Sequence, residues 1–124
     1  MKSRFWNWHR IGLVFAALFM SGVVGCNRAG VAVTVTNATG GEITGLEVRF
    51  TGGSKSRPML RASESFEAKI NPRGESHLVI VFTDSSGKQH SAEVDVYFER
   101  GYRGTIRVTI RPDGTVSWKD EIKA

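Results

Sequence analysis

The sequence predicts an all-β fold, a small antiparallel β-sandwich of about seven strands with an immunoglobulin-like architecture, behind an N-terminal helical signal peptide. Apolar and polar residues alternate with period two in several short runs, as at Val31, Val33 and Val35. This alternation is typical of half-buried strands. Turn-forming residues separate the runs at spacings typical of a sandwich, and no stretch of residues 27–124 shows convincing helical periodicity.

Each expected strand is bounded by turn chemistry. The strands are expected at residues 31–36, 46–51, 65–70, 76–83, 91–98, 105–111 and 115–119. Gly, Pro, Asn and Asp mark turns at 37–42, 52–58, 71–74, 84–88 and 111–114. The stretch 59–68 is ambiguous, and we interpret it as a turn that leads into a strand.

The turns fix a register, because a one-residue slip would move every apolar side chain to the other face. We expect four cross-strand pairs: Ile110 with Val116, Val108 with Trp118, Val96 with Val108, and Leu78 with Val94. The opposite face would then carry two rows across four strands. One row holds His77, Asp95, Thr109 and Ser117, and the other holds Glu75, Tyr97, Arg107 and Lys119.

These rows do not predict catalysis. A nucleophilic triad needs the His between the nucleophile and the Asp, whereas Asp95 would separate His77 from both hydroxyls. In the second row, Tyr97 and Arg107 could form a cation–π pair that stabilises the sheet surface, or a partner-binding patch. Arg107 opposite Lys119 is unfavourable without an acidic group, which hints at an anionic partner.

The first 26 residues have the layout of an export signal. Lys2, Arg4 and Arg10 precede an apolar run over residues 11–24, which is short of the roughly 20 residues that span a membrane. The run ends in Val23-Val24-Gly25-Cys26. This segment resembles the lipobox of bacterial lipoproteins that are processed by the lipoprotein signal peptidase.

The resemblance implies cleavage between Gly25 and Cys26, with lipid attached to Cys26 as a membrane anchor. Two or three acyl chains hold a protein stably at a membrane. By the same resemblance, an Asp after the Cys would favour inner-membrane retention, whereas residue 27 is Asn. We therefore expect a signal peptide at 1–25, a lipidated Cys and tether at 26–30, and a domain at 31–124 in the cell envelope, at the outer membrane.

The charge balance argues against nucleic-acid binding, and the available side chains argue against a metal site. Three of the 17 Lys and Arg residues precede residue 26 and none of the 12 Asp and Glu residues does, so the net charge falls from +5 to +2 on processing. No basic stripe for nucleic acid is left. The processed chain keeps only His77 and His90, about 17 Å apart along the predicted hairpin, so we expect no metal and no cofactor.

The segment from Glu99 to Gly104 combines Arg100, Tyr102 and Arg103 with two glycines. It is either a hairpin connection with Tyr102 packed over the edge of the core, or a contact for an anionic lipid, glycan or protein. A second basic loop at 53–58 would extend this patch if the two lay together.

The sequence thus predicts a non-enzymatic envelope lipoprotein that binds an envelope protein or an anionic glycan or lipid, by a sheet edge or the Tyr97 face. The alternative is a periplasmic inhibitor-like module. Its Glu99 to Gly104 loop would bind the acidic cleft of an envelope enzyme.

Overall fold

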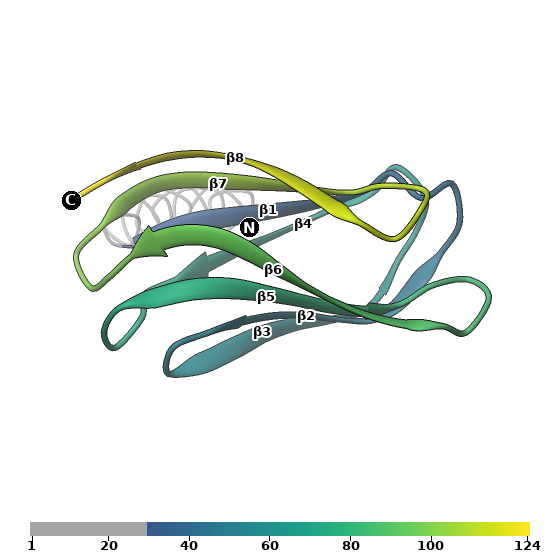
Figure 1. Cartoon of the computed structure of the whole chain (residues 1–124), viewed down its shortest axis with the longest axis horizontal. Coiled ribbons are helices and arrows are strands. Elements are labelled where there is room, and N and C mark those ends of the chain that lie inside the picture. Colours follow the sequence, from purple (N-terminus) through teal and green to yellow (C-terminus); the bar gives the residue numbers. More distant parts are fainter. Residues whose placement is uncertain (1–29) are drawn as a thin grey trace, which may run out of the picture.

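The computed structural model describes residues 30–124, which form eight strands in two packed sheets (Figure 1). The strands are β1 (Gly30–Asn37), β2 (Ile43–Phe50), β3 (Gly53–Leu60), β4 (Ser65–Ile70), β5 (Ser76–Thr83), β6 (Gln89–Phe98), β7 (Arg103–Ile110) and β8 (Val116–Lys123). The expected all-β sandwich is confirmed. Among residues 30–124, no helix has the length and hydropathy needed to cross a membrane.

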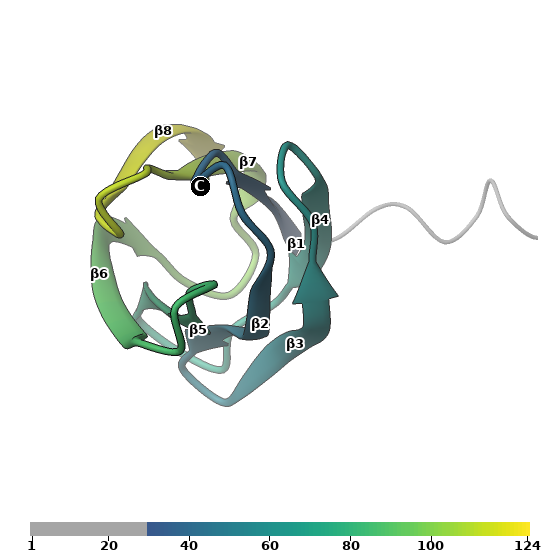
Figure 2. The ribbon, with the colours of Figure 1, turned by 90° about the vertical axis from the view of Figure 1, so that its right-hand side faces the viewer.

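Each sheet has four strands. The first has the order β4-β1-β7-β8 and the second the order β3-β2-β5-β6. Within residues 30–124 all pairings are antiparallel except that of β1 with β7, which is parallel. Viewed along the strands, the two sheets enclose the core, with β6 beside β8 and β3 beside β4 at the corners (Figure 2).

The alternation seen in the sequence places one face of each sheet in the core. In β1, every second residue is buried, and Val31, Val33 and Val35 are fully inaccessible. The largest buried side chains from the facing sheet include Phe82 and Phe98. Each such side chain contributes about 1.5–3 kcal/mol relative to an exposed position.

The strand β3 was expected to be a turn over residues 52–58, and that prediction is wrong. Its register runs antiparallel to β2, after a two-residue connection at Thr51 and Gly52. Because β3 is an edge strand, only Leu60 is buried, and no alternating pattern marks it in the sequence. An edge position also accommodates Pro58, which lacks a backbone donor.

Three of the four expected cross-strand pairs are confirmed, namely Ile110 with Val116, Val108 with Trp118, and Leu78 with Val94. The pairing of Val96 with Val108 is wrong, because β6 and β7 belong to different sheets. Both side chains are buried, but they come from the two layers of the sandwich. The two four-strand rows built on that pairing are therefore not formed.

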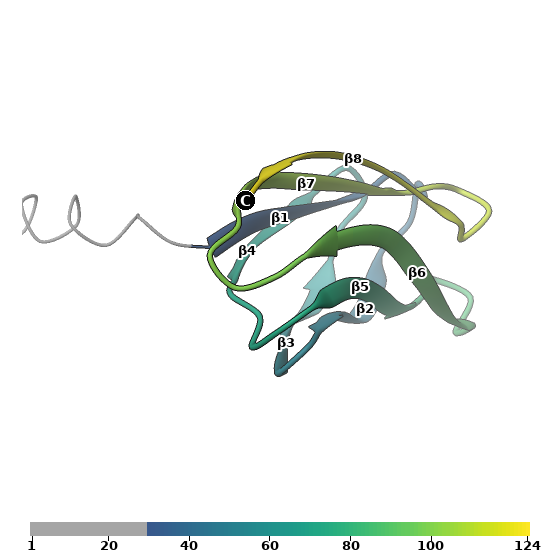
Figure 3. The same ribbon diagram turned by 60° about the vertical axis from the view of Figure 1, so that its left-hand side comes forward.

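The strand directions define two ends of the sandwich. We call proximal the end where β1 begins at Gly30, and it also holds residues 51–52, 71–75 and 99–102 together with the start of β7 and the end of β8 (Figure 3). The distal end holds the connections 38–42, 61–64, 84–88 and 111–115.

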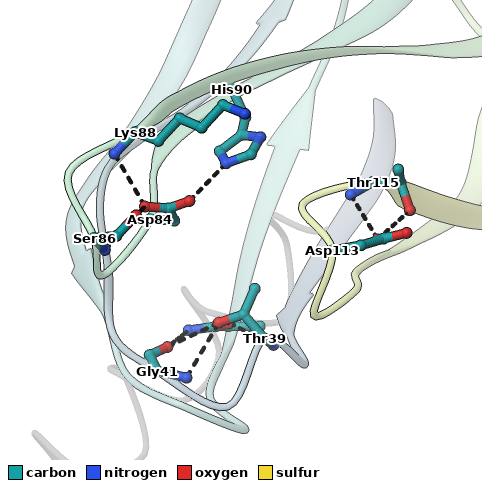
Figure 4. Close-up of polar contacts among 9 residues, drawn as sticks. Thr39, Gly41, Asp84, Ser86, Lys88, His90, Asp113 and Thr115 are labelled. Atoms are coloured by element: carbon teal, nitrogen blue, oxygen red, sulfur yellow. Dashed lines mark hydrogen bonds and ion pairs between the residues drawn. The ribbon is translucent and has the colours of Figure 1, made fainter.

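Three distal connections share one capping device, an Asn or Asp followed two residues later by Ser or Thr (Figure 4). In each, the side-chain oxygen of the first residue accepts bonds from the backbone N–H and the hydroxyl of the second. The pairs are Asn37 with Thr39, Asp84 with Ser86, and Asp113 with Thr115. Side chains of this kind stabilise turns by replacing backbone partners.

Asp84 has the most partners of the three. It also lies 2.8 Å from Nε2 of His90, whose ring stacks on Phe82 with 4.8 Å between centroids. The His90 hydrogen bond, followed by those of Ser86 and Lys88, holds the pKa of the Asp84 carboxyl far below its ordinary value. A β-carbon at Gly114 would overlap the His90 ring, so the ring packs directly against Gly114. His90 therefore links the 84–88 connection, through Asp84, to the 111–115 connection.

Asn37 is buried, and its amide group ties the end of β1 to the β3–β4 connection. Its Nδ2 donates to the carbonyl oxygens of Gly41, Leu60 and Arg61 at 2.8, 3.0 and 3.1 Å. The side chain thus links backbone groups that lie up to 24 residues apart in the sequence, and its bond to the Leu60 carbonyl is buried.

We expect Asn37→Ala to lower the free energy of unfolding by about 3 kcal/mol, because it leaves the buried carbonyl of Leu60 and the partly buried carbonyls of Gly41 and Arg61 without this partner. Asp113→Ala is the matched control, since it removes the same kind of turn bond at an exposed position, and its loss should be clearly smaller. Urea unfolding of both variants measures the difference. Equal losses would contradict the role given to Asn37.

Candidate interaction surface

The parallel pairing of β1 with β7 brings the start of the described chain beside the Glu99 to Gly104 segment. Gly30 is the register partner of Arg103, and Arg103 is in turn the partner of Lys123 on β8. Like charges at directly opposed positions are unfavourable unless an anion is near. The proximal end therefore presents two adjacent cations beside Gly30.

The connection from β6 to β7 is a crossover between the sheets, and the expectation of a hairpin here is wrong. Its turn is closed by a hydrogen bond from the N–H of Tyr102 to the carbonyl of Glu99 at 3.1 Å, with Gly101 at a φ of 90°. Tyr102 packs against the core cluster, as expected. Arg100 and Arg103 are exposed beside it.

Tyr97 lies next to this crossover. Its ring meets that of Tyr102 edge to face, with 6.2 Å between centroids. Its hydroxyl donates to Oε2 of Glu99 at 2.8 Å and to Oε1 of Glu75 at 3.3 Å. The Glu99 hydrogen bond, with burial and the two negative charges, raises the pKa of the Tyr97 phenol well above its ordinary value.

Arg73 adds a further cation at the proximal end. The backbone N–H of Arg73 donates to the Thr51 carbonyl at 3.2 Å, which joins the 71–75 connection to the β2–β3 turn. A β-carbon at Gly52 would lie 2.8 Å from Cγ of Arg73, so glycine permits this close approach at a φ of 98°. The side chain of Arg73 thus crosses over the turn.

Arg107 does not lie beside Tyr97, because it projects from the outer face of the other sheet. It faces Lys119 as expected, but its Nη1 donates to Oε1 of Glu121 at 2.8 Å. The charge mismatch is therefore relieved within the chain. This pair no longer argues for an anionic partner.

The expected basic loop at 53–58 does not extend the patch, since these residues belong to β3. Arg57 lies 3.7 Å from Glu64 and its guanidinium carbon is 6.0 Å from the ring centroid of Phe66, so it contacts the neighbouring sheet instead.

A shallow hollow of about 520 Å3 lies on the outer face of the second sheet, beside the irregular pairing of β5 with β6. Its rim includes His77, Glu93 and Asp95. Thr109 and Ser117 pair on the outer face of the opposite sheet, about 10 Å of packed core away. The His77 to Ser117 row is thus divided by the sandwich.

No three His, Cys, Asp or Glu side chains within residues 30–124 converge on a point where a metal ion could bind. His90 pairs with Phe82 as expected, at the distal end, and His77 lines the hollow near the proximal end. The proposed lipid attachment at Cys26 and the cleavage site at Gly25 lie outside the described residues.

Sequence reasoning found Arg100, Tyr97, Tyr102 and Arg103 but not the residues that complete this end. Lys123 joins them because β8 continues past residue 119, where the last strand was expected to end, and Arg73 joins them because β4 ends at this end of the sandwich. Their position at the ends of turns and strands was the available signal. That position does not show which end of the sandwich a residue occupies until the strand directions are known.

Comparisons with known proteins bear on the fold alone. No model of a known protein family and no curated protein matches this chain. A solved NMR structure of a protein from Eubacterium rectale is similar, with a TM-score of 0.55 and 11% sequence identity. The match covers 77% of this chain and 91% of the chain from Eubacterium rectale. At this identity the likeness shows a shared sandwich fold.

Tyr97 should titrate at a pH clearly above the ordinary tyrosine value of 10.0. The sequence has two tyrosines, so Tyr102→Phe leaves Tyr97 as the single phenol to follow by phenolate absorbance. Adding Glu99→Gln should lower the midpoint, because it removes a charge and changes the acceptor of the hydrogen bond. Glu93→Gln is the control on the same sheet face. The same midpoint in both variants would contradict the geometry of the Tyr97 cluster.

Proposed function

We propose that the chain is a lipid-anchored lipoprotein of the cell envelope, with a β-sandwich that acts as a non-enzymatic binding or structural module. The observation that carries this proposal is the order of the basic start, the apolar run and Val23-Val24-Gly25-Cys26 ahead of a folded domain. β1 begins at Gly30, four residues after Cys26.

The surface of the domain supports binding rather than catalysis. The hollow near His77 is lined by carboxylates and a tyrosine, and the hydroxyl pair of Thr109 and Ser117 lies on the far sheet face. Exposed Tyr and Arg side chains at the proximal end are residue types that are enriched in binding hot spots. Asn27 is the basis for proposing the outer membrane.

Lipidation is tested by substituting the acceptor. In the wild type, the mature mass should exceed that of the peptide from Cys26 to Ala124 by the attached lipid, and the protein should fractionate with membranes. Cys26→Ser should abolish the added mass and leave an unprocessed precursor or a released domain. Asn27→Asp is the control, since it should keep the lipid and move the protein to the inner membrane. An unmodified Cys26 in mature wild-type protein would contradict the proposal.

The alternative function is an inhibitor-like module that binds an acidic cleft of an envelope enzyme. The exposed Arg100 and Arg103, which flank a tight turn at the end of the sandwich, favour it. The turn is short, however, and its Tyr102 is held against the core.

Arg103→Glu should separate these functions. If the domain binds a protein through the Glu99 to Gly104 segment, the substitution should abolish recovery of that protein after crosslinking in intact cells. The attraction between Arg103 and the acidic groups of the cleft would become a repulsion. If the domain binds a protein through a sheet edge, recovery should stay nearly unchanged. Lys119→Glu is the control on the same sheet.

A further inference from the structure

The proximal end carries an excess of unpaired positive charge. Its connections and strand ends hold four cations and two carboxylates, namely Arg73, Arg100, Arg103, Lys123, Glu75 and Glu99. Both carboxylates accept hydrogen bonds from Tyr97. Within the described part of the chain, none of the four cations has a carboxylate within 4.0 Å.

The distal end has the opposite balance. Its connections hold three cations and four carboxylates, namely Arg61, Lys88, Arg111, Glu42, Glu64, Asp84 and Asp113. Two of the carboxylates, Asp84 and Asp113, are fixed by turn hydrogen bonds. The domain is thus electrically polar along the strand direction, with its positive end where β1 begins.

The chain itself places this positive end near the membrane. This step rests on the proposed function, which supplies the lipid at Cys26. Three residues lie between Cys26 and Gly30, and the four Cα-to-Cα steps can span at most about 14 Å when the chain is fully extended. Gly30 is the register partner of Arg103. A short tether therefore lets Arg103 and its neighbours approach the bilayer to within the Debye length of about 8 Å, where charges are only partly screened.

We propose that the proximal end docks on anionic phospholipid headgroups, with Arg100 and Arg103 as the main contacts and Arg73 and Lys123 beside them. Guanidinium groups bind phosphate oxygens in pairs, which suits three of these four residues. Tyr97 is 54% exposed at the same end, and tyrosine rings favour the region between headgroups and acyl chains. Docking would hold the strands upright on the membrane and present the distal end to the periplasm or the cell exterior.

The geometry favours a lipid surface over an acidic protein cleft. A cleft that bound the proximal end would have to fit between the domain and the bilayer, within the reach of the three residues between Cys26 and Gly30. A lipid surface is present there as soon as Cys26 is anchored. The distal end and the two sheet faces are left as the surfaces that a protein partner could reach.

The test compares backbone hydrogen exchange of the lipidated mature protein in two kinds of vesicle. One contains phosphatidylcholine alone, and the other contains phosphatidylcholine with phosphatidylglycerol. We expect slower exchange at residues 71–75 and 99–102 in the anionic vesicles, with no change at 84–88. High salt should remove the difference, because it screens the headgroup charge.

Arg100→Gln with Arg103→Gln should lower the ratio of docked to undocked domain on the order of 30-fold, given the usual contribution of each basic residue near an anionic membrane. Arg61→Gln with Lys88→Gln is the matched control at the distal end and should leave the ratio unchanged. Circular dichroism of each variant checks that the sandwich is folded.

The outcomes separate the two proposals. Equal exchange in both vesicles, or an effect that survives the Arg100 and Arg103 substitutions, would overturn docking while the lipid mass on Cys26 kept the lipoprotein assignment. Protection that needs an added envelope protein on neutral vesicles would overturn lipid docking and support the inhibitor-like alternative. A mature protein without lipid would overturn the proposed function, and the docking inference with it.

Discussion

The parallel pairing of β1 with β7 is the constraint on which the rest of the molecule depends. It runs over all eight residues of both strands, from Gly30 with Arg103 to Asn37 with Ile110. Parallel neighbours cannot be joined by a tight turn, so β7 reaches β1 through a crossover, and the chain passes through strands of the other sheet on the way. This pairing makes β1 a central strand, buries Val31, Val33 and Val35 between two neighbours, and places Arg103 beside Gly30.

The two ends of the sandwich differ in construction and in charge. At the distal end, Asn37, Asp84 and Asp113 fix the connections through bonds to the backbone. At the proximal end, the crossover after β6 carries Arg100 and Arg103 without carboxylate partners in residues 30–124. A distal end with hydrogen-bonded connections and a cationic proximal end suit the proposed docking, in which the domain stands on an anionic surface and presents its far end to other molecules.

The sequence predicts strand positions and hairpin registers, because both depend on residues that are close together along the chain. The expected strands at 65–70 and 76–83 match β4 and β5, and the hairpin registers around 84–88 and 111–115 are correct. Sheet membership depends on distant strands, so Val96 was paired with Val108 across what are two layers. The partner of Arg107 was missed for a local reason, because the last strand was expected to end at residue 119, two residues before Glu121. That Gly30 lies beside the basic end could not be predicted without knowing that β1 pairs with β7.

Nuclear Overhauser effects between the backbones of β1 and β7 test the account most directly, in the mature protein held in micelles. The account predicts contacts in a parallel pattern that begins at Gly30 and Arg103 and continues through Val33 with Ile106 to Asn37 and Ile110. Such contacts would place the start of the sandwich, at Gly30, beside the cationic crossover. Contacts that instead joined β1 to β2, as in a simple up-and-down meander, would contradict it and would separate the tether from Arg103.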